Sequence, residues 1–467
     1  MSEAAAPAIA SARDPRSALV WTGAALGAVL TLLLLHPGQY PFDSAFQLWQ
    51  ARTANYWNVS PVSMPLLWSL LLRLFDDPAS LLCLNLAMYW TGIAFCLDAL
   101  RGPPPLRALL VLACGLVPLS LVQMGHLLSD AHLAGVLVLL SGLIADGMAS
   151  ARRSRLLAAL PLLVYAGGIR HNALLATLPL AVLLAAWLAR GAPRVRTRVL
   201  GSGAIVAATL VLSFALDRSF VVERKTTWPS IALWDLAAVS LEVDRLLLPD
   251  FTHGPGLSVA ELRDTGAFDP TTNTRLFERS RSGIGSGLGR GYPPDQLAAL
   301  RASWWSAVTA HPIEYLQHRA RTFLLLAGSG TGDWQGLAYF AGYTRFADNP
   351  ETASPAIAPA WHAGFHAYAE RLRGTWLFSA WPALAMLVVA GVLAWRRRRQ
   401  PPAALVLACS ASALLYAAGF VVLAPGAELR YLTWPVVVAP LALAMAIAGR
   451  HARSTVPMPV AAPAALA

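Results

Sequence analysis

Ten long apolar segments separated by short polar joints dominate this chain. They cover roughly residues 18–35, 79–98, 106–122, 131–149, 156–169, 173–189, 199–216, 376–394, 402–423 and 432–448. A helix needs about 20 apolar residues to cross the hydrocarbon core of a bilayer. Lipid offers the backbone no hydrogen-bond partners, so segments of this kind form helices. The pattern predicts an all-α polytopic membrane protein with about ten transmembrane helices.

The composition supports a membrane protein and excludes a nucleic-acid binder. Hydrophobic residues make up 56% of the chain and charged residues only 13%, although the net charge is +11. The basic residues are nearly all arginines, Lys225 being the only lysine, and they cluster in the joints between apolar segments. Clusters in such joints set membrane orientation. We therefore expect membrane lipids, and no nucleic acid, among the partners of this protein.

The arginine clusters also predict the topology. They are Arg13 and Arg16, Arg101 and Arg107, Arg152 to Arg155, Arg190 to Arg198, Arg396 to Arg399, and Arg450 and Arg453. All six fall on one side only if the chain crosses ten times, and the positive-inside rule makes that side cytoplasmic. Both termini are then cytoplasmic. Arginine-rich, lysine-poor usage is typical of a bacterium with a GC-rich genome, which predicts a multi-pass inner-membrane protein whose opposite face is periplasmic.

The long joint before the eighth apolar segment predicts a three-part organisation. Residues 1–216 form an N-terminal transmembrane module of seven helices, and 376–467 form a C-terminal module of three helices and a tail. Residues 217–375 carry most of the acidic residues and many Pro, Gly and Thr, so we expect a mostly helical extracytoplasmic segment. The apolar stretch 62–75 is too short to span and is interpreted as an interfacial helix on the outer surface.

Five charged residues in four short joints fall on the predicted periplasmic side. They are Asp43, Asp130, Arg170, Glu428 and Arg430. Charge at the membrane edge is costly and is usually kept for a function. Five such charges on one face predict a single site at one membrane surface.

Asp43 lies just past the first apolar segment, in a joint rich in aromatic residues that include Trp57. A carboxylate at a half-desolvated membrane edge can act as a general base, and aromatic rings suit the faces of sugars. The alternatives are that Asp43 caps a helix and that Trp57 belongs to the ordinary interfacial belt.

The second outer joint holds Asp130, close to His126. Asp130 would supply a second carboxylate beside Asp43, able to bind a divalent cation, Mg²⁺ or Mn²⁺, together with a phosphate. The alternative is that Ser129 and Asp130 cap the following helix. No metal ligands are assigned and no cofactor is required; a divalent cation stays open.

Arginines in the third and last outer joints are candidate phosphate ligands. The helix before Arg170, from Leu156 to Gly168, is about 20 Å long and shorter than a bilayer core. Arg170 is therefore expected below the surface, in a polar cavity, where its planar fork of donors fits a phosphate. The alternative is an arginine that snorkels to lipid headgroups. Glu428, Arg430 and Tyr431 stand at the mouth of the last helix. The alternative is that Glu428 and Arg430 simply pair with other groups, but a second arginine facing the same cavity favours an anion site.

This pattern resembles the GT-C superfamily of integral-membrane glycosyltransferases. The matching features are Asp43 after the first helix, a short interfacial helix, Asp130 in the next outer loop and seven helices before a long outer segment. Arg170 in R-H-N and Arg430–Tyr431 in E-L-R-Y look like the late-loop basic positions of such enzymes. Many members carry two acids in the first loop, whereas here Asp43 stands alone, which argues against metal binding in that loop.

The resemblance implies an inverting enzyme that moves a sugar from a polyprenyl-phosphate donor to an extracytoplasmic glycan, lipid or protein acceptor. Asp43 and Asp130 would be the catalytic residues, and Arg170, Arg430, Tyr431, Glu428, His126 and Trp57 would bind substrate. A polymerase or ligase of lipid-linked glycans differs mainly in its donor. A flippase or transporter is the other alternative, but the sequence shows no inverted repeats and no helix broken at the midplane.

Overall fold

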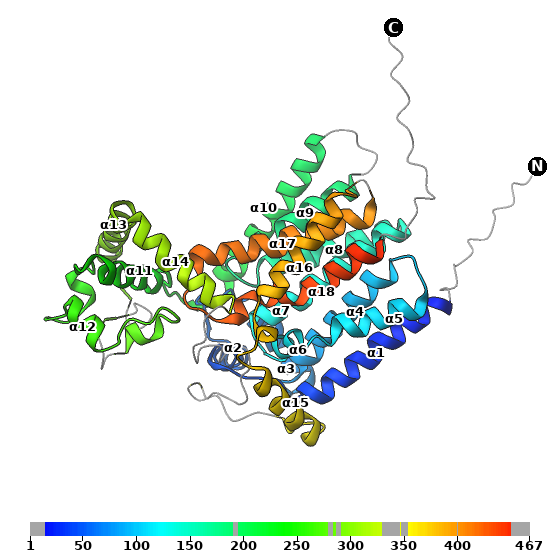
Figure 1. Ribbon diagram of the computed structural model, residues 1–467, viewed down its shortest axis with the longest axis horizontal. Coiled ribbons are helices and arrows are strands. Elements are labelled where there is room, and N and C mark those ends of the chain that lie inside the picture. Colours follow the sequence, from blue (N-terminus) through cyan, green and yellow to red (C-terminus); the bar gives the residue numbers. More distant parts are fainter. Residues whose placement is uncertain are drawn as a thin grey trace, which may run out of the picture.

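The computed structural model is an α-helical bundle with a helical lobe at one end (Figure 1). It describes residues 15–189, 195–278, 284–285, 291–328, 346, 354–398 and 400–449. The expected cytoplasmic termini and several arginines, among them Arg194 and Arg399, lie outside the described residues. The described residues are almost entirely helices and their connecting loops, as expected for an all-α membrane protein.

Each of the ten apolar segments is largely helical, and two of them, 106–122 and 376–394, consist of two helical pieces. The N-terminal helices are α1 (Pro15–Leu35), α2 (Phe42–Thr53), α3 (Ser63–Phe75), α4 (Ser80–Asp98), α5 (Pro104–Gly115), α6 (Pro118–Met124), α7 (Ser129–Ser150), α8 (Arg153–Gly167), α9 (Ala173–Leu188) and α10 (Val195–Phe220). The C-terminal elements are η4 (Trp376–Phe378), α16 (Trp381–Trp395), α17 (Pro401–Leu423), η5 (Leu429–Leu432) and α18 (Thr433–Ala448). The stretch 62–75, expected to be a short helix, is α3.

Within the described residues, six helices are long and apolar enough to cross a membrane: α1, α4, α7, α10, α17, and α18 together with η5. The bent pair α5 and α6 makes a seventh if it counts as one span, and α9 and α16 are shorter apolar helices. The count of ten spans, with its orientation, therefore stays a prediction. The prediction that several helices are long and apolar enough to span a membrane is confirmed.

The third apolar segment is a broken helix, which corrects the expectation of unbroken spans. α5 and α6 are bent by 62° at a short break. Val117 leaves helical geometry there (φ −58°, ψ 122°) because the following Pro118 disfavours helical geometry at the preceding residue.

Close packing of α4 against α7 fixes these two helices relative to each other. A Cβ added at Gly142 would lie 2.6 Å from the carbonyl oxygen of Gly92, and one added at Gly92 would collide with the backbone of Val138. Small residues at such contacts let two helix backbones approach closely. The first turn of α7, which carries Asp130, is therefore set on a rigid pair of helices.

The segment between α10 and α16 divides into two parts. Its helices are α11 (Trp228–Val243), α12 (Val259–Asp264), α13 (Pro294–Ala310), α14 (Pro312–Leu326) and α15 (Pro359–Leu372), with η1 (Asp250–Thr252) and η2 (Thr274–Phe277). We call α11 to α14 the helical lobe; it has its own core, with Leu233, Trp234 and Leu300 fully buried. The end of α14 and the buried side of α15 join the core of the bundle instead.

The end of the bundle that faces the lobe carries the short joints of interest, and we call it the lobe end (Figure 1). There α1 and α17 end, and α4, α7, α9 and α18 begin. A two-stranded parallel ribbon of β1 (Tyr56–Trp57) and β2 (Val221–Glu223) lies between the joint after α2 and the end of α10.

Candidate functional site

The charged residues of four separate joints meet at the lobe end. Arg430 Nη1 lies 2.5 Å from Asp43 Oδ2, and its Nε donates to the carboxylate of Glu428. Arg170 Nη1 lies 2.5 Å from Asp130 Oδ2. The five residues thus form two ion-paired groups, and we call them together the charged cluster.

Tyr431 connects the two groups. The guanidinium carbon of Arg430 lies 5.1 Å from the centroid of the Tyr431 ring, and that of Arg170 lies 5.7 Å from it. The separation of the two guanidinium carbons therefore cannot exceed the sum of these distances. The ring itself is held by stacking on Phe420 of α17, with centroids 5.2 Å apart. The structure brings together the five charged residues and Tyr431.

Arg430 is positioned by the turn that starts α18. It lies in η5, and the hydroxyl of Thr433 donates to its carbonyl oxygen over 2.6 Å. The same hydroxyl lies 3.0 Å from Gln123 Oε1, which ties this turn to the end of α6. Only 10% of the Arg430 side chain is exposed. Its guanidinium is therefore held inside the protein, not at the surface.

Arg170 is held below the lobe end by the shortness of α8. This helix has 15 residues, about 22 Å at 1.5 Å per residue. The turn that follows packs tightly: a Cβ at Gly167 would collide with Thr209, and Ser63 Oγ donates to the Gly168 carbonyl over 2.9 Å. The Arg170 side chain, 18% exposed, donates to Ser129 Oγ and Asp130. It is directed at the first turn of α7 and is largely shielded from solvent.

The two carboxylates with capping alternatives do not cap. Asp43 is the second residue of α2, whose N-cap, Pro41, makes no side-chain capping bond. Asp130 lies in the first turn of α7, whose N-cap is Leu128, again without a side-chain cap. Both carboxylates pair with arginines from distant joints instead.

Asp43 is the most accessible carboxylate of the charged cluster. Its side chain is 46% exposed, against 2% for Asp130 and 17% for Glu428. Its dense surroundings alone would raise the pKa of the Asp43 carboxyl, but the guanidiniums of Arg430 and Arg170 offset this, and the pKa ends below its ordinary value. Asp43 is therefore ionised at neutral pH and open to an incoming molecule.

His126 lies buried beside the charged cluster. Burial and the positive charge of Arg430 lower the pKa of its imidazole to about 4, so the ring is neutral at physiological pH. Among the described residues, neither ring nitrogen makes a hydrogen bond of good geometry, and Asp130 Oδ1 and Gln123 Nε2 are buried in the same state. Buried polar groups are normally satisfied. Three such groups near one cluster leave hydrogen-bonding capacity that a polar ligand or water could use.

Trp57 lies away from the charged cluster, toward the other end of α2. Its backbone N–H donates to Gln50 Oε1 over 2.8 Å, and seven residues of helix, about 10 Å, separate Gln50 from Asp43. The Trp57 ring packs against Phe46 and Trp49, with centroids 5.5 and 5.7 Å away. No contact in the described part of the chain joins Trp57 to the charged cluster. Its role as a substrate-binding residue stays a prediction.

The charged cluster does not fit a metal centre. Within the described ranges, no three His, Cys, Asp or Glu side chains come together in an arrangement that could hold a metal ion. The carboxylates of Asp43, Glu428 and Asp130 are taken up by arginines. We therefore assign no chemical step to a divalent cation.

The sequence missed two contributors to this region. Gln39 joins the site through the backbone, because its N–H donates to the Gly125 carbonyl and its carbonyl accepts from Leu127, on either side of His126. Arg319, buried in the lobe, donates to the carbonyl of Ala424 in the joint that leads to Arg430. A signal existed for Arg319: it falls on the buried stripe of α14 with Tyr315, Thr322 and Leu326.

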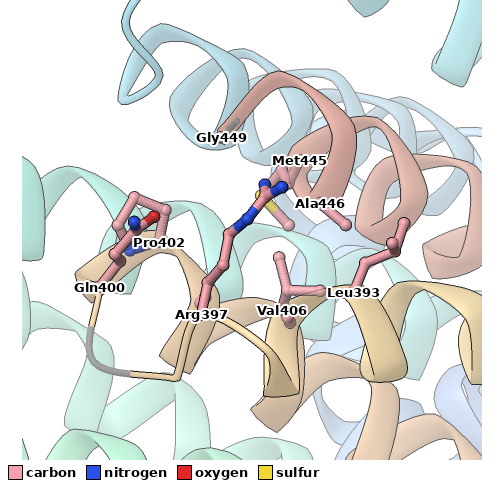
Figure 2. Close-up of a pocket in the computed structure, with 10 residues that line it drawn as sticks. Leu393, Arg397, Gln400, Pro402, Val406, Met445, Ala446 and Gly449 are labelled. Carbon is pink, nitrogen blue, oxygen red and sulfur yellow. The ribbon is translucent and has the colours of Figure 1, made fainter. Parts of the chain in front are cut away.

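A small pocket elsewhere in the bundle is not part of this site (Figure 2). Its walls come from the ends of α16 and α18 and the start of α17, and include Leu393, Arg397, Gln400, Val406, Met445 and Gly449. Arg430 stands before the opposite end of α18, a helix of 16 residues, about 24 Å long. The pocket therefore lies at the far end of the bundle from the charged cluster.

Comparison with known proteins identifies no family. A scan against protein-family models finds no match, and a search of curated proteins finds none either.

Proposed function

We propose that this protein is an inverting membrane glycosyltransferase that moves a sugar from a polyprenyl-phosphate donor to an acceptor at the lobe end. The observation that carries the proposal is one juxtaposition at the ends of apolar helices. A half-exposed, ionised carboxylate, Asp43, lies beside two buried guanidiniums, Arg170 and Arg430, which flank one tyrosine ring. A base next to an anion site, at the ends of apolar helices, suits a lipid-phosphate donor.

The reaction assigned to this geometry needs no external energy source. Asp43 accepts the proton of an acceptor hydroxyl while the hydroxyl oxygen attacks the anomeric carbon of the donor. The new C–O bond forms as the bond from the anomeric carbon to the phosphate oxygen breaks, which inverts the anomeric centre. The electron pair leaves with the lipid phosphate. The proton on Asp43 is later released to solvent, which reaches this partly exposed side chain.

The arginines would stabilise the leaving phosphate. A guanidinium has five N–H donors in a planar fork. Within the described residues, the side-chain bonds of Arg170 come from Nη1 alone, so other donors of its fork remain to engage a phosphate. Such donors, held in place before the reaction in a site with little water, favour the developing charge.

The charge balance of the cluster suits this sequence of events. When all five groups are ionised, the three carboxylates outnumber the two guanidiniums by one negative charge. Proton uptake by Asp43 would bring the cluster to neutrality as negative charge builds on the phosphate. His126, neutral and buried beside the cluster, offers a further polar contact without adding a charge of its own.

We further propose that the chain crosses the inner membrane ten times, with both termini in the cytoplasm and the lobe in the periplasm. Support comes from the arginine clusters and from the far end of the bundle, where Arg107 and Arg155 pair with Asp98 and Asp146. Reporter fusions at Pro104 and Pro270 test it, because these positions should report opposite sides. Two fusions on the same side would overturn this topology.

The direct test of function is sugar transfer by the purified protein in lipid nanodiscs. A panel of polyprenyl-phosphate sugars would be incubated with envelope acceptors, and release of free polyprenyl phosphate measured. We expect release with at least one donor, and loss of release in Asp43→Asn. Asp264→Asn, at an exposed position of α12, is the matched control. A folded wild-type protein that releases no lipid phosphate from any donor would contradict the proposal.

A lipid-linked glycan flippase is the second candidate, and the broken helix favours it. Transporters often place their substrates at discontinuous helices, and α5 and α6 are bent by 62°. A polymerase or ligase of lipid-linked glycans differs from the first proposal mainly in its donor. Movement of a labelled lipid-linked glycan between leaflets, without any transfer of its sugar, would favour the flippase.

A further inference from the structure

The helical lobe contacts the joint that leads to Arg430 through one buried arginine. Arg319 of α14 donates through Nη1 to the carbonyl oxygen of Ala424 over 2.8 Å. Ala424 is the C-cap of α17, and the last carbonyls of a helix favour a nearby cation. The Nη2 of Arg319 lies 2.7 Å from the carboxylate of Asp235 on α11. Arg319 therefore bridges the core of the lobe and the end of a membrane helix.

Asp235, which forms the ion pair with Arg319, is itself held by neighbouring side chains of the lobe. Its carboxylate accepts from Trp304 Nε1 over 2.9 Å, and the ring of His318 lies 3.3 Å away. The Arg319 and Asp235 side chains are 2% and 1% exposed. The guanidinium carbon also lies 5.8 Å from the centroid of the Trp234 ring. Burying an ion pair is costly, and this pair fixes the direction of a guanidinium fork toward one carbonyl.

A second set of contacts joins the backbone of the lobe to the same joint. The N–H of Ala427 donates to the Thr271 carbonyl over 2.6 Å, and the N–H of Asn273 donates to the Pro425 carbonyl over 3.4 Å. Thr272 pairs with Gly426 as an isolated bridge. A Cβ at Gly426 would lie 3.1 Å from the Thr271 carbonyl, so the backbones approach closely here. Residues 424–427 are thus clamped by the lobe, and Glu428 and Arg430 follow directly.

We infer that Arg319 and Asp235 are positioning residues, which hold the 424–427 joint so that Arg430 faces Arg170 and Asp43. This inference rests on the proposed function, because it assigns the lobe the task of aligning one half of a phosphate site. Arg319 touches neither Arg430 nor any reacting group in the described residues; it acts through the backbone of the joint. Loosening the clamp lets Arg430 drift, which weakens binding of the lipid phosphate.

The test compares Arg319→Lys with the wild-type protein by two readouts. Lysine keeps the charge but cannot reach both Ala424 and Asp235 with a planar fork. Hydrogen–deuterium exchange should speed up in the peptide that covers 424–432 and stay unchanged in 126–132. The KM for the polyprenyl-phosphate donor should rise about tenfold, as expected for one lost hydrogen bond to a charged group, with kcat within about threefold. Arg107→Lys, which alters the partly buried Arg107–Asp98 pair at the far end, is the matched control and should change neither.

Each outcome decides the inference. Faster exchange at 424–432 together with weaker donor binding supports it; unchanged exchange, or faster exchange with unchanged donor binding, overturns it. If the wild type transfers no sugar, the affinity for polyprenyl phosphate in nanodiscs replaces KM, so the clamp is judged apart from the proposed reaction. Should Arg319→Lys fail to fold, the nearly isosteric Asp235→Asn is subjected to the same two readouts, with the same criteria.

Discussion

The two ends of the helical bundle use the same residue types in different ways. At the far end, Arg107 pairs with Asp98 and Arg155 with Asp146, each across 9 residues of chain. At the lobe end, Arg430 pairs with Asp43 across 387 residues, and Arg170 with Asp130 across 40. A pair between chain neighbours stabilises one turn between two helices. A pair that joins distant joints requires the whole bundle and gathers charge at one point.

The difference separates arginines that set topology from those that build a site. Far-end arginines lie beside carboxylates of the same hairpin, where the positive-inside rule expects them. The arginines of the lobe end carry a desolvation cost, since they are largely buried, and both flank one tyrosine ring. Substitutions at both ends, made in pairs, test whether this contrast is functional.

The largest effect is expected from Asp43→Asn. The amide keeps the shape of the carboxylate but cannot accept a proton, so sugar transfer should fall at least about 100-fold. Asp98→Asn, at the far end, should stay within about twofold of wild type. Rates of lipid-phosphate release in nanodiscs measure both. Equal losses in the two variants would remove the functional contrast between the ends.

A smaller loss is expected from Arg170→Lys. Lysine supplies a point charge without the planar fork, so affinity for the donor should drop about tenfold. The same change at Arg155, which pairs with Asp146 at the far end, should leave donor affinity unchanged. Binding of polyprenyl phosphate checks this prediction. Unchanged binding in Arg170→Lys would mean that this arginine only supports Asp130.

The pH profile sharpens the assignment of the base. The arginine charges more than offset the effect of burial and lower the pKa of Asp43, so kcat/KM should not decline between about pH 8 and pH 5. The ion pair of Asp43 stabilises the fold above the ordinary carboxyl pKa, and this stability is lost as the pH falls through the lowered pKa. An acid limb near neutral pH would assign the base to another group.

The smallest effect is expected from Trp57→Phe. The ring packs with Phe46 and Trp49, and the Trp57 N–H donates to Gln50, seven residues along α2 from Asp43. Phenylalanine preserves most of this packing, so transfer and donor affinity should stay within about twofold. A selective rise in the KM for the acceptor would instead assign the aromatic cluster to acceptor binding.

Much of this architecture could be predicted because it follows from the apolar pattern. Each apolar segment became helical, and joints at alternate ends had to share a face, which brought Asp43, Asp130, Arg170, Glu428 and Arg430 together. The partner of each charge could not be predicted, since pairing depends on side-chain geometry across distant joints. The capping alternatives for Asp43 and Asp130 were reasonable from local sequence, and long-range ion pairs replaced them.

Two further features could not be predicted from the sequence, for different reasons. The break between α5 and α6 follows from Pro118, whose effect on Val117 is local, but an uninterrupted apolar run concealed it. The role of Arg319 depends on the placement of the lobe against the end of α17, and no local pattern sets that placement. Its position on the buried stripe of α14 signalled a buried charge without indicating a partner.

A structure with bound polyprenyl phosphate tests the central claim most directly. We predict density for the phosphate within hydrogen-bond distance, about 3 Å, of guanidinium nitrogens of both Arg170 and Arg430, with Asp43 facing the sugar side. The lipid tail should follow the apolar helices away from the lobe. A phosphate bound at the far end, beside Arg397 or Arg107, with the charged cluster unchanged, would contradict the account.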